Sequence, residues 1–286
     1  MHELELLKSI YASASQSSDI TIGPGDDMGE LQIGSERILC AIDHLILGRH
    51  VAPKAPPASI GRKAIARCFS DIAAMAAHPI GSLMTACIPS DMSNDWCEQV
   101  FDGAKIVAEQ WGGPIFGGDI ASCNEAPPIF TVTAFATPPK RGAILRTGAE
   151  VGDYICVTGE LGNSQEAHHL TFTPRIEEAQ KLLQVLGEDL HSMIDISDGL
   201  GQDASHLASD TVQLVVEENS IPLRAGATIQ GALCEGEDYE LLFTSKTIPP
   251  SHLATVIGSV CIRKPSNPAV ITSDGVDISS YGWSHT

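Results

Sequence analysis

Gly23-Pro24-Gly25-Asp26-Asp27 places two adjacent carboxylates at the tip of a tight turn. Proline fixes φ and glycine permits positive φ, so this backbone favours a turn over a long strand or helix. Neighbouring carboxylates repel each other unless a proton or a cation lies with them. The pair therefore indicates either an oxygen-ligand site for Mg²⁺ or a similar ion, or a solvated acidic turn.

The composition excludes several classes of protein. The chain has 286 residues, 43% of them hydrophobic, which suffices for one large or two ordinary domains. Its formal net charge of -19 argues against nucleic-acid binding. No apolar run approaches the roughly 18 residues of a membrane span, and the N-terminus lacks the pattern of a secretion signal. The 8 cysteines form no C-x-x-C pair, so we expect a cytoplasmic protein with reduced cysteines that binds neither nucleic acid nor membranes.

Acidic residues recur where apolar strands break into glycines. These residues are Asp26, Asp27, Asp119, Asp198 and Glu237. A site for phosphate and metal needs both carboxylate oxygens and an unobstructed backbone. Neither a P-loop nor a dinucleotide-binding glycine motif is present, so the cationic role of a P-loop lysine falls largely to metal ions. The pattern favours a nucleotide site with several metals.

The apolar periodicity predicts alternating strands and helices. We expect an antiparallel hairpin over 31–42, helices over 60–77, 95–111 and 175–186, strands over 80–88, 127–136, 154–158 and 212–216, and a last hairpin over 255–278. Asp71 falls inside the first helix, where an ion pair with Arg67, four residues earlier, is the alternative to a site role. The Pro-rich segment 138–142 indicates a linker, so we expect domains at 1–137 and 138–286.

An ordered set of motifs runs through nearly the whole chain. The motifs are Gly25-Asp26-Asp27, Asp43 with Gly48-Arg49-His50, Gly61-Arg62-Lys63-Ala64 with Ser70-Asp71-Ile72, Gly117-Gly118-Asp119, Arg146-Thr147-Gly148-Ala149, Asp195-Ile196-Ser197-Asp198-Gly199 and Gly236-Glu237-Asp238-Tyr239-Glu240. In this order they resemble the thiamine-monophosphate kinase family of the aminoimidazole-ribotide synthetase-like superfamily. Each motif is modest alone, but their ordered set is specific.

The resemblance implies a fold and an activity. The fold class is α/β (α+β), with an N-terminal mixed sheet that has helices on one face and a C-terminal α/β domain. The N-terminal domain would bind ATP and metal and form a homodimer. The activity would be direct in-line transfer of the γ-phosphoryl group of ATP to thiamine monophosphate, giving thiamine diphosphate. Several Mg²⁺ ions would assist, and no protein nucleophile is needed.

The resemblance also assigns residues. Metal ligands would be Asp27, Asp43, Asp71 and Asp198, with Asp195 supporting them; nucleotide-binding residues would be Gly118, Asp119, Arg146 and Ser197; residues facing thiamine monophosphate would be His50, Glu237 and Trp283. Simpler interpretations are a surface histidine for His50 and a docked tail for Trp283.

Several positions depart from the family pattern. They are Met28, Ala41, Ile42, Cys68 and Glu235, where small, hydroxyl, amide or glycine residues are usual. Water on Mg²⁺ can replace a lost hydroxyl ligand, whereas Glu235 bears on the choice of acceptor. Two alternatives therefore stay open: a superfamily relative that uses ATP on another acceptor, and a non-catalytic nucleotide-binding paralogue.

Overall fold

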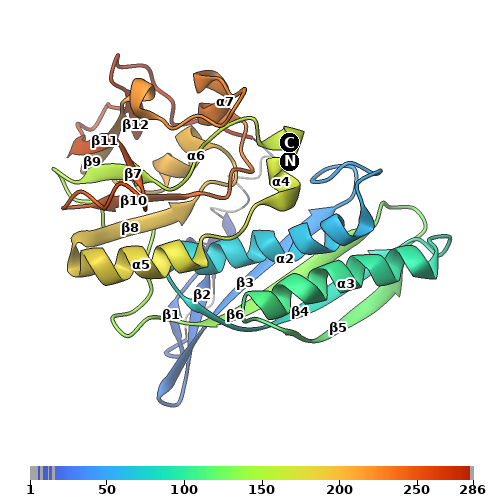
Figure 1. Ribbon diagram of the computed structural model, residues 1–286. Coiled ribbons are helices and arrows are strands. Elements are labelled where there is room, and N and C mark those ends of the chain that lie inside the picture. Colours follow the sequence, from blue (N-terminus) through green and yellow to red (C-terminus); the bar gives the residue numbers. More distant parts are fainter. Residues whose placement is uncertain (1–5, 7–8, 12, 15–16, 284–286) are drawn as a thin grey trace.

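Two six-stranded sheets form the framework of the computed structural model, which describes residues 6, 9–11, 13–14 and 17–283 (Figure 1). The first sheet contains β1 (Ile20–Ile22), β2 (Gly29–Ile33), β3 (Glu36–Ile46), β4 (His78–Ile88), β5 (Ile115–Ser122) and β6 (Ile129–Thr137). Its order is β1-β2-β3-β6-β4-β5, with β4 and β5 parallel and the other neighbours antiparallel. The predicted N-terminal sheet is therefore mixed, as expected.

The second sheet contains β7 (Tyr154–Val157), β8 (Leu190–Asp195), β9 (Val212–Val216), β10 (Leu241–Ser245), β11 (Thr255–Ile262) and β12 (Val270–Thr272). Its order is β12-β9-β11-β7-β10-β8. The hairpin predicted over 255–278 is wrong, because β9 lies between β11 and β12 and runs parallel to β12. The apolar pattern marks these strands correctly but carries no information about which strand each one pairs with.

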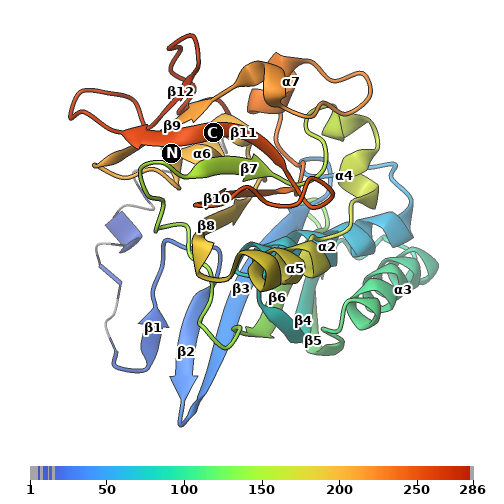
Figure 2. The ribbon, with the colours of Figure 1, turned by 60° about the vertical axis from the view of Figure 1, so that its left-hand side comes forward.

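Helices pack against both sheets (Figures 1 and 2). They are α2 (Pro57–Ala74), α3 (Asn94–Gln110), α4 (His168–Thr171), α5 (Ile176–Leu186), α6 (Leu200–Ser205) and α7 (Ile229–Cys234), with short 3-10 helices η1 (Ser164–Glu166), η2 (Gly187–Asp189) and η3 (Glu218–Ser220). In the described part of the chain, no helix is both long enough and apolar enough to cross a membrane.

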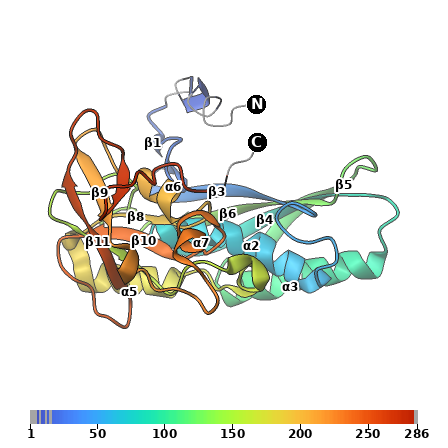
Figure 3. The ribbon, with the colours of Figure 1, turned by 90° about the horizontal axis from the view of Figure 1, so that it is seen from above.

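Helices α2 and α3 cover one face of the first sheet (Figure 3). Side chains of β3 that point to these helices are buried, including Leu39 and Ala41, whereas Ile42 on the other face is 67% exposed. This period of two is expected of a sheet packed on one side. The two helices approach closely because Gly61 has no side chain; a Cβ there would lie 1.8 Å from the carbonyl oxygen of Val100.

The second sheet is packed on both faces, and its strand β10 is accordingly apolar at successive positions. Leu241 and Phe243 of β10 belong to the core shared with α2 and α5, whereas Leu242 between them packs with the core under α6 and α7. A strand covered on both sides reads as a continuous apolar run rather than an alternating one. The first of these cores also holds residues of β3 and α2, so α2 joins the two sheets.

Candidate active site

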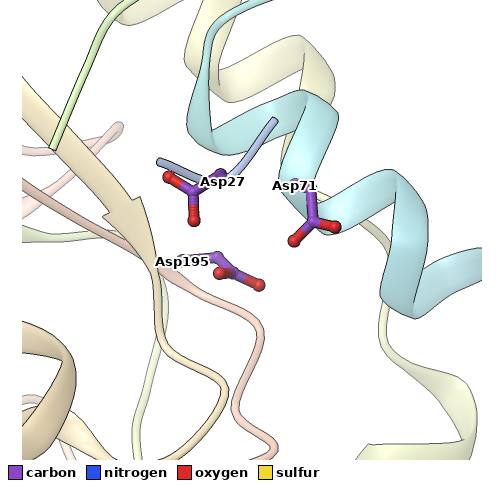
Figure 4. Close-up of side chains that lie close together, drawn as sticks. All are labelled: Asp27, Asp71 and Asp195. Atoms are coloured by element: carbon purple, nitrogen blue, oxygen red, sulfur yellow. The ribbon is translucent and has the colours of Figure 1, made fainter. Parts of the chain in front are cut away.

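Three carboxylates from distant parts of the chain converge at one point (Figure 4). Asp27 lies in the turn before β2, Asp71 lies near the end of α2, and Asp195 is the last residue of β8. One oxygen of each group lies within 4.8 Å of an oxygen of the other two. We call Asp27, Asp71 and Asp195 the carboxylate cluster. All three were predicted to be at a metal site, and the fold brings them together.

The carboxylate cluster is unfavourable when all of its groups are ionised. Burial, followed by the charges of Asp195 and Asp27, raises the pKa of Asp71 well above its ordinary value. Burial and the charge of Asp27 raise the pKa of Asp195 to about 7, although Ser70 Oγ donates a 2.6 Å hydrogen bond to it. A cation placed among these oxygens would remove the repulsion.

The residues present fit a hard divalent cation. Arg146 Nη2 lies 2.7 Å from Asp27 Oδ1, which leaves Asp27 Oδ2 buried and without a hydrogen-bond partner among the described residues. Buried carboxylate oxygens normally have a partner, and carboxylate oxygens are the ligands that Mg²⁺ prefers. Asp27, Asp71 and Asp195 would supply ligands to such an ion.

A cavity of about 620 Å³ adjoins the cluster, and Asp71 and Asp195 line it. Its other charged lining residues are Asp43, Asp198, Glu235, Glu237, Arg49 and Arg67. Acidic groups outnumber basic ones, so a phosphate-bearing ligand needs cations with it to enter this cavity.

One wall of the cavity is formed by two turns of the second sheet. The first follows β8, at 196–199, and the second precedes β10, at 235–240. The main-chain N–H of Glu237 donates to Ser197 O, and that of Tyr239 donates to Ile196 O, each at 2.8 Å. A Cβ at Gly236 would lie 2.6 Å from Ser197 O, so this approach requires glycine. Glu237 and Tyr239 have φ values of 56° and 51°, which residues with side chains rarely adopt. Backbone strain of this kind is common where a side chain must be aimed at a ligand.

Asp203 supports the first of these turns. Its Oδ2 accepts hydrogen bonds from the main-chain N–H groups of Ser197, Asp198 and Gly199 at 2.9, 2.9 and 3.0 Å. The sequence alone gave Asp203 no role. The available signal was an aspartate near the start of a helix that follows a glycine turn, where carboxylates often bind main-chain amides.

His50, Glu237 and Trp283, predicted to face the acceptor, all line the cavity. Burial and the charge of Arg67 lower the pKa of His50 to about 4, so its ring is neutral at neutral pH. Its Nδ1 accepts a 3.0 Å hydrogen bond from the main-chain N–H of Ile46, which puts the ring proton on Nε2. Trp283 packs against this side of the cavity, with the Arg49 guanidinium 4.8 Å from its ring centroid.

Helix α2 presents a row of charged side chains to the site. Lys63, Arg67 and Asp71 are spaced by four residues and so lie on one face of the helix. Arg67 binds Asp43 through Nε and Nη2 at 2.7 and 3.1 Å, so the alternative of an ion pair between Arg67 and Asp71 is wrong. Lys63 and Arg67 received no site role from the sequence. Their charge at this spacing in an otherwise apolar helix was the available signal.

Of the other predicted site residues, four lie at the cavity or the carboxylate cluster and two do not. Asp43, Ser197 and Asp198 line the cavity, and Arg146 reaches Asp27. Gly118 and Asp119 lie on β5, at the edge of the first sheet, and are not among the residues that line the cavity.

The departures from the family pattern fall into two groups. Met28, Ala41 and Cys68 are buried in the core beneath the first sheet, where their apolar side chains pack. Ile42 and Glu235 line the cavity instead. Glu235 Oε2 accepts a 2.8 Å hydrogen bond from the main-chain N–H of Asn163, which fixes this carboxylate at the wall.

Known proteins resemble this chain in both sequence and fold. A family model described as AIR synthase related protein, N-terminal domain, matches residues 25–137. The thiamine-monophosphate kinase of Rhodopirellula baltica is 31% identical, over 92% of this chain and 92% of its own length. This chain belongs to the thiamine-monophosphate kinase family. The thiamine-monophosphate kinase of Salmonella typhimurium is 30% identical over 86% of this chain and 83% of its own.

A solved structure matches this chain along its whole length. AaThiL complexed with AMPPCP and TMP superimposes with a TM-score of 0.86 and 27% identity, over 100% of this chain and 97% of that one. The predicted family and the predicted fold class are therefore confirmed. The prediction of a phosphotransferase is confirmed as well.

Proposed function

We propose that this chain transfers the γ-phosphoryl group of ATP to thiamine monophosphate, giving ADP and thiamine diphosphate. The observation that carries the proposal is the position of the carboxylate cluster beside a cavity lined by His50, Glu237 and Trp283. A terminal oxygen of thiamine monophosphate attacks the γ-phosphorus, and the bond to the oxygen bridging the β- and γ-phosphorus atoms breaks. Both reactants are anions, so the work of the site is charge neutralisation and alignment.

Mg²⁺ is the cation that we propose for the cluster. Asp27, Asp71 and Asp195 would hold it, and Asp43 and Asp198 lie along the same cavity as further ligands. When bound, Mg²⁺ supplies positive charge and orientation to the phosphates. Arg146 and Ser197, beside the cluster, support the proposed nucleotide position. The assignment of Gly118 and Asp119 to the nucleotide stays a prediction.

The acceptor end of the cavity suits thiamine chemistry. The thiazolium ring of thiamine carries a positive charge, and carboxylates at Glu235 and Glu237 attract a cation. Trp283 offers an aromatic face on which a heterocycle can stack. His50, neutral and with its proton on Nε2, is a hydrogen-bond donor.

We also propose a homodimer formed through the first sheet. The face that α2 and α3 leave uncovered carries Leu31, Ile33, Ile42 and Phe116, which are 44%, 60%, 67% and 66% exposed. Large apolar side chains that gather on the uncovered face of a sheet commonly mark an interface. A second copy of the chain, packed sheet to sheet, would cover it. The cytoplasmic location and the absence of nucleic-acid and membrane binding stay predictions.

The test is a turnover assay with the purified protein, ATP, Mg²⁺ and thiamine monophosphate. We expect ADP and thiamine diphosphate in equal amounts, with no thiamine diphosphate from Asp71→Asn and none when a chelator replaces Mg²⁺. Release of ADP with other phosphorylated acceptors only would overturn the named substrate. Calorimetric binding of AMPPCP without turnover of any acceptor would select the non-catalytic alternative.

A further inference from the structure

Lys63 is a fully buried lysine, with 0% of its surface exposed. Its Nζ donates to the main-chain oxygen of His50, and lies 2.7 Å from His169 Nδ1 and 2.7 Å from Glu237 Oε2. A lysine ammonium has three hydrogens to donate, so these three acceptors saturate it. Full burial of a lysine is rare and requires such compensation.

The partners of Lys63 come from different sheets. His50 follows β3 in the first sheet, whereas Glu237 lies in the turn before β10 of the second. Both side chains line the cavity at the proposed acceptor end. One ammonium group therefore fixes the spacing between two acceptor-facing residues that belong to different sheets.

His169 completes the arrangement from a third segment. Its Nδ1 lies 2.7 Å from Lys63 Nζ and 3.2 Å from Glu237 Oε2. A single ring nitrogen cannot accept from the lysine and donate to the carboxylate in one protonation state. The saturated ammonium assigns Nδ1 as the acceptor and the ring proton to Nε2. Gln165 Nε2, from the same segment, donates to Glu237 Oε2 at 3.2 Å.

The network keeps Glu237 ionised and fixed. Burial alone would raise the pKa of Glu237, but the positive charges of Lys63 and Arg67 oppose burial and keep the pKa below its ordinary value. Arg67 adds positive charge, with Nη1 3.8 Å from Glu237 Oε1. The charges facing Lys63 are thus Glu237 and, farther away, Arg67 and Asp43.

We propose that Lys63 and His169 are positioning residues for the phosphoryl acceptor, which act by holding Glu237 and the His50 loop in place. This inference rests on the proposed function, in which the acceptor is thiamine monophosphate. Neither residue touches the carboxylate cluster, so the two residues govern the acceptor rather than the nucleotide and its metal.

The test compares Lys63→Met with the wild type, with Lys105→Met on the exposed side of α3 as the matched control. We expect the KM for thiamine monophosphate to rise about tenfold or more in Lys63→Met, because the charged hydrogen bond to Glu237 is lost. The KM for ATP should stay within about twofold, since the cluster is untouched. A rise of both KM values by the same factor, or of neither, would overturn the proposal.

A second pair of variants keeps the proposal falsifiable where Lys63→Met does not fold. His169→Leu removes the acceptor for Lys63, and His169→Gln restores one through its amide oxygen. We expect only the leucine variant to raise the KM for the acceptor, and equal effects of both variants would overturn the proposal. Failure of the wild type to phosphorylate thiamine monophosphate refutes the proposed function instead. In that case, nitrogen NMR of His169 still tests the network, because a proton on Nδ1 in the wild type contradicts it.

Discussion

Replacement of Asp71 by asparagine should have opposite effects on stability and on metal binding. Two unit charges 4.8 Å apart repel by about 3 kcal/mol at an effective dielectric constant of about 20. Proton uptake and relaxation relieve part of this repulsion, so we expect Asp71→Asn to raise the free energy of unfolding by about 1–3 kcal/mol without Mg²⁺. Affinity for Mg²⁺ should fall at least about tenfold, because one charged ligand is lost.

The stabilisation that Asp71→Asn brings should increase as the pH rises. Folding raises the pKa of Asp195 from 3.8 to about 7 and raises that of Asp71 as well. Such carboxyl groups bind protons more tightly in the folded than in the unfolded chain, so the free energy of unfolding falls as pH rises through this window. The gain from Asp71→Asn should therefore be absent near about pH 4 and should grow as the pH rises toward about 8.

The assay is urea unfolding followed by circular dichroism, with chelator and with Mg²⁺, at both pH values. Calorimetric titration of AMPPCP and Mg²⁺ gives the affinities. Asp95→Asn is the matched control, because Asp95 is an exposed residue of α3 that accepts a hydrogen bond from Gln99. A variant at Asp71 that is destabilised in chelator and keeps its response to Mg²⁺ would refute the assignment of Asp71 to a metal site.

Three further outcomes follow from the site and the sheet. Trp283→Ala should raise the KM for thiamine monophosphate about tenfold through the loss of stacking, with little change in the KM for ATP, and steady-state kinetics would detect it. Phe116→Glu should give a monomer by light scattering, because it places a charge on the uncovered face of the first sheet; a persistent dimer would contradict the interface. Burial lowers the pKa of Lys63 to about 8, so the KM for the acceptor should rise as the ammonium loses its proton between about pH 7 and 9. The same pH profile should be flat in Lys63→Met, and parallel profiles would count against Lys63 as the titrating group.

Local patterns predicted the three long helices α2, α3 and α5 and most strands, whereas the short helices α4 and α7 were not predicted. The helix expected over 60–77 is α2 (Pro57–Ala74), and the helix expected over 95–111 is α3 (Asn94–Gln110). These predictions succeed because apolar periodicity reports how each element meets the core. The pairing of β12 with β9 escaped prediction, because strand partners depend on contacts between segments far apart in the sequence.

The turn at Gly23-Asp27, together with the ordered motifs, determined the family and the identity of the acidic residues. Sequence alone could not show that Asp27, Asp71 and Asp195 form one cluster. Their proximity arises only when β8 and α2 pack against each other. It also gave no role to Lys63, whose charge is satisfied by His50, His169 and Glu237. Residue types and short-range spacing can be read directly from the sequence. A buried charge, in contrast, acquires its partners, and hence its role, only through tertiary packing.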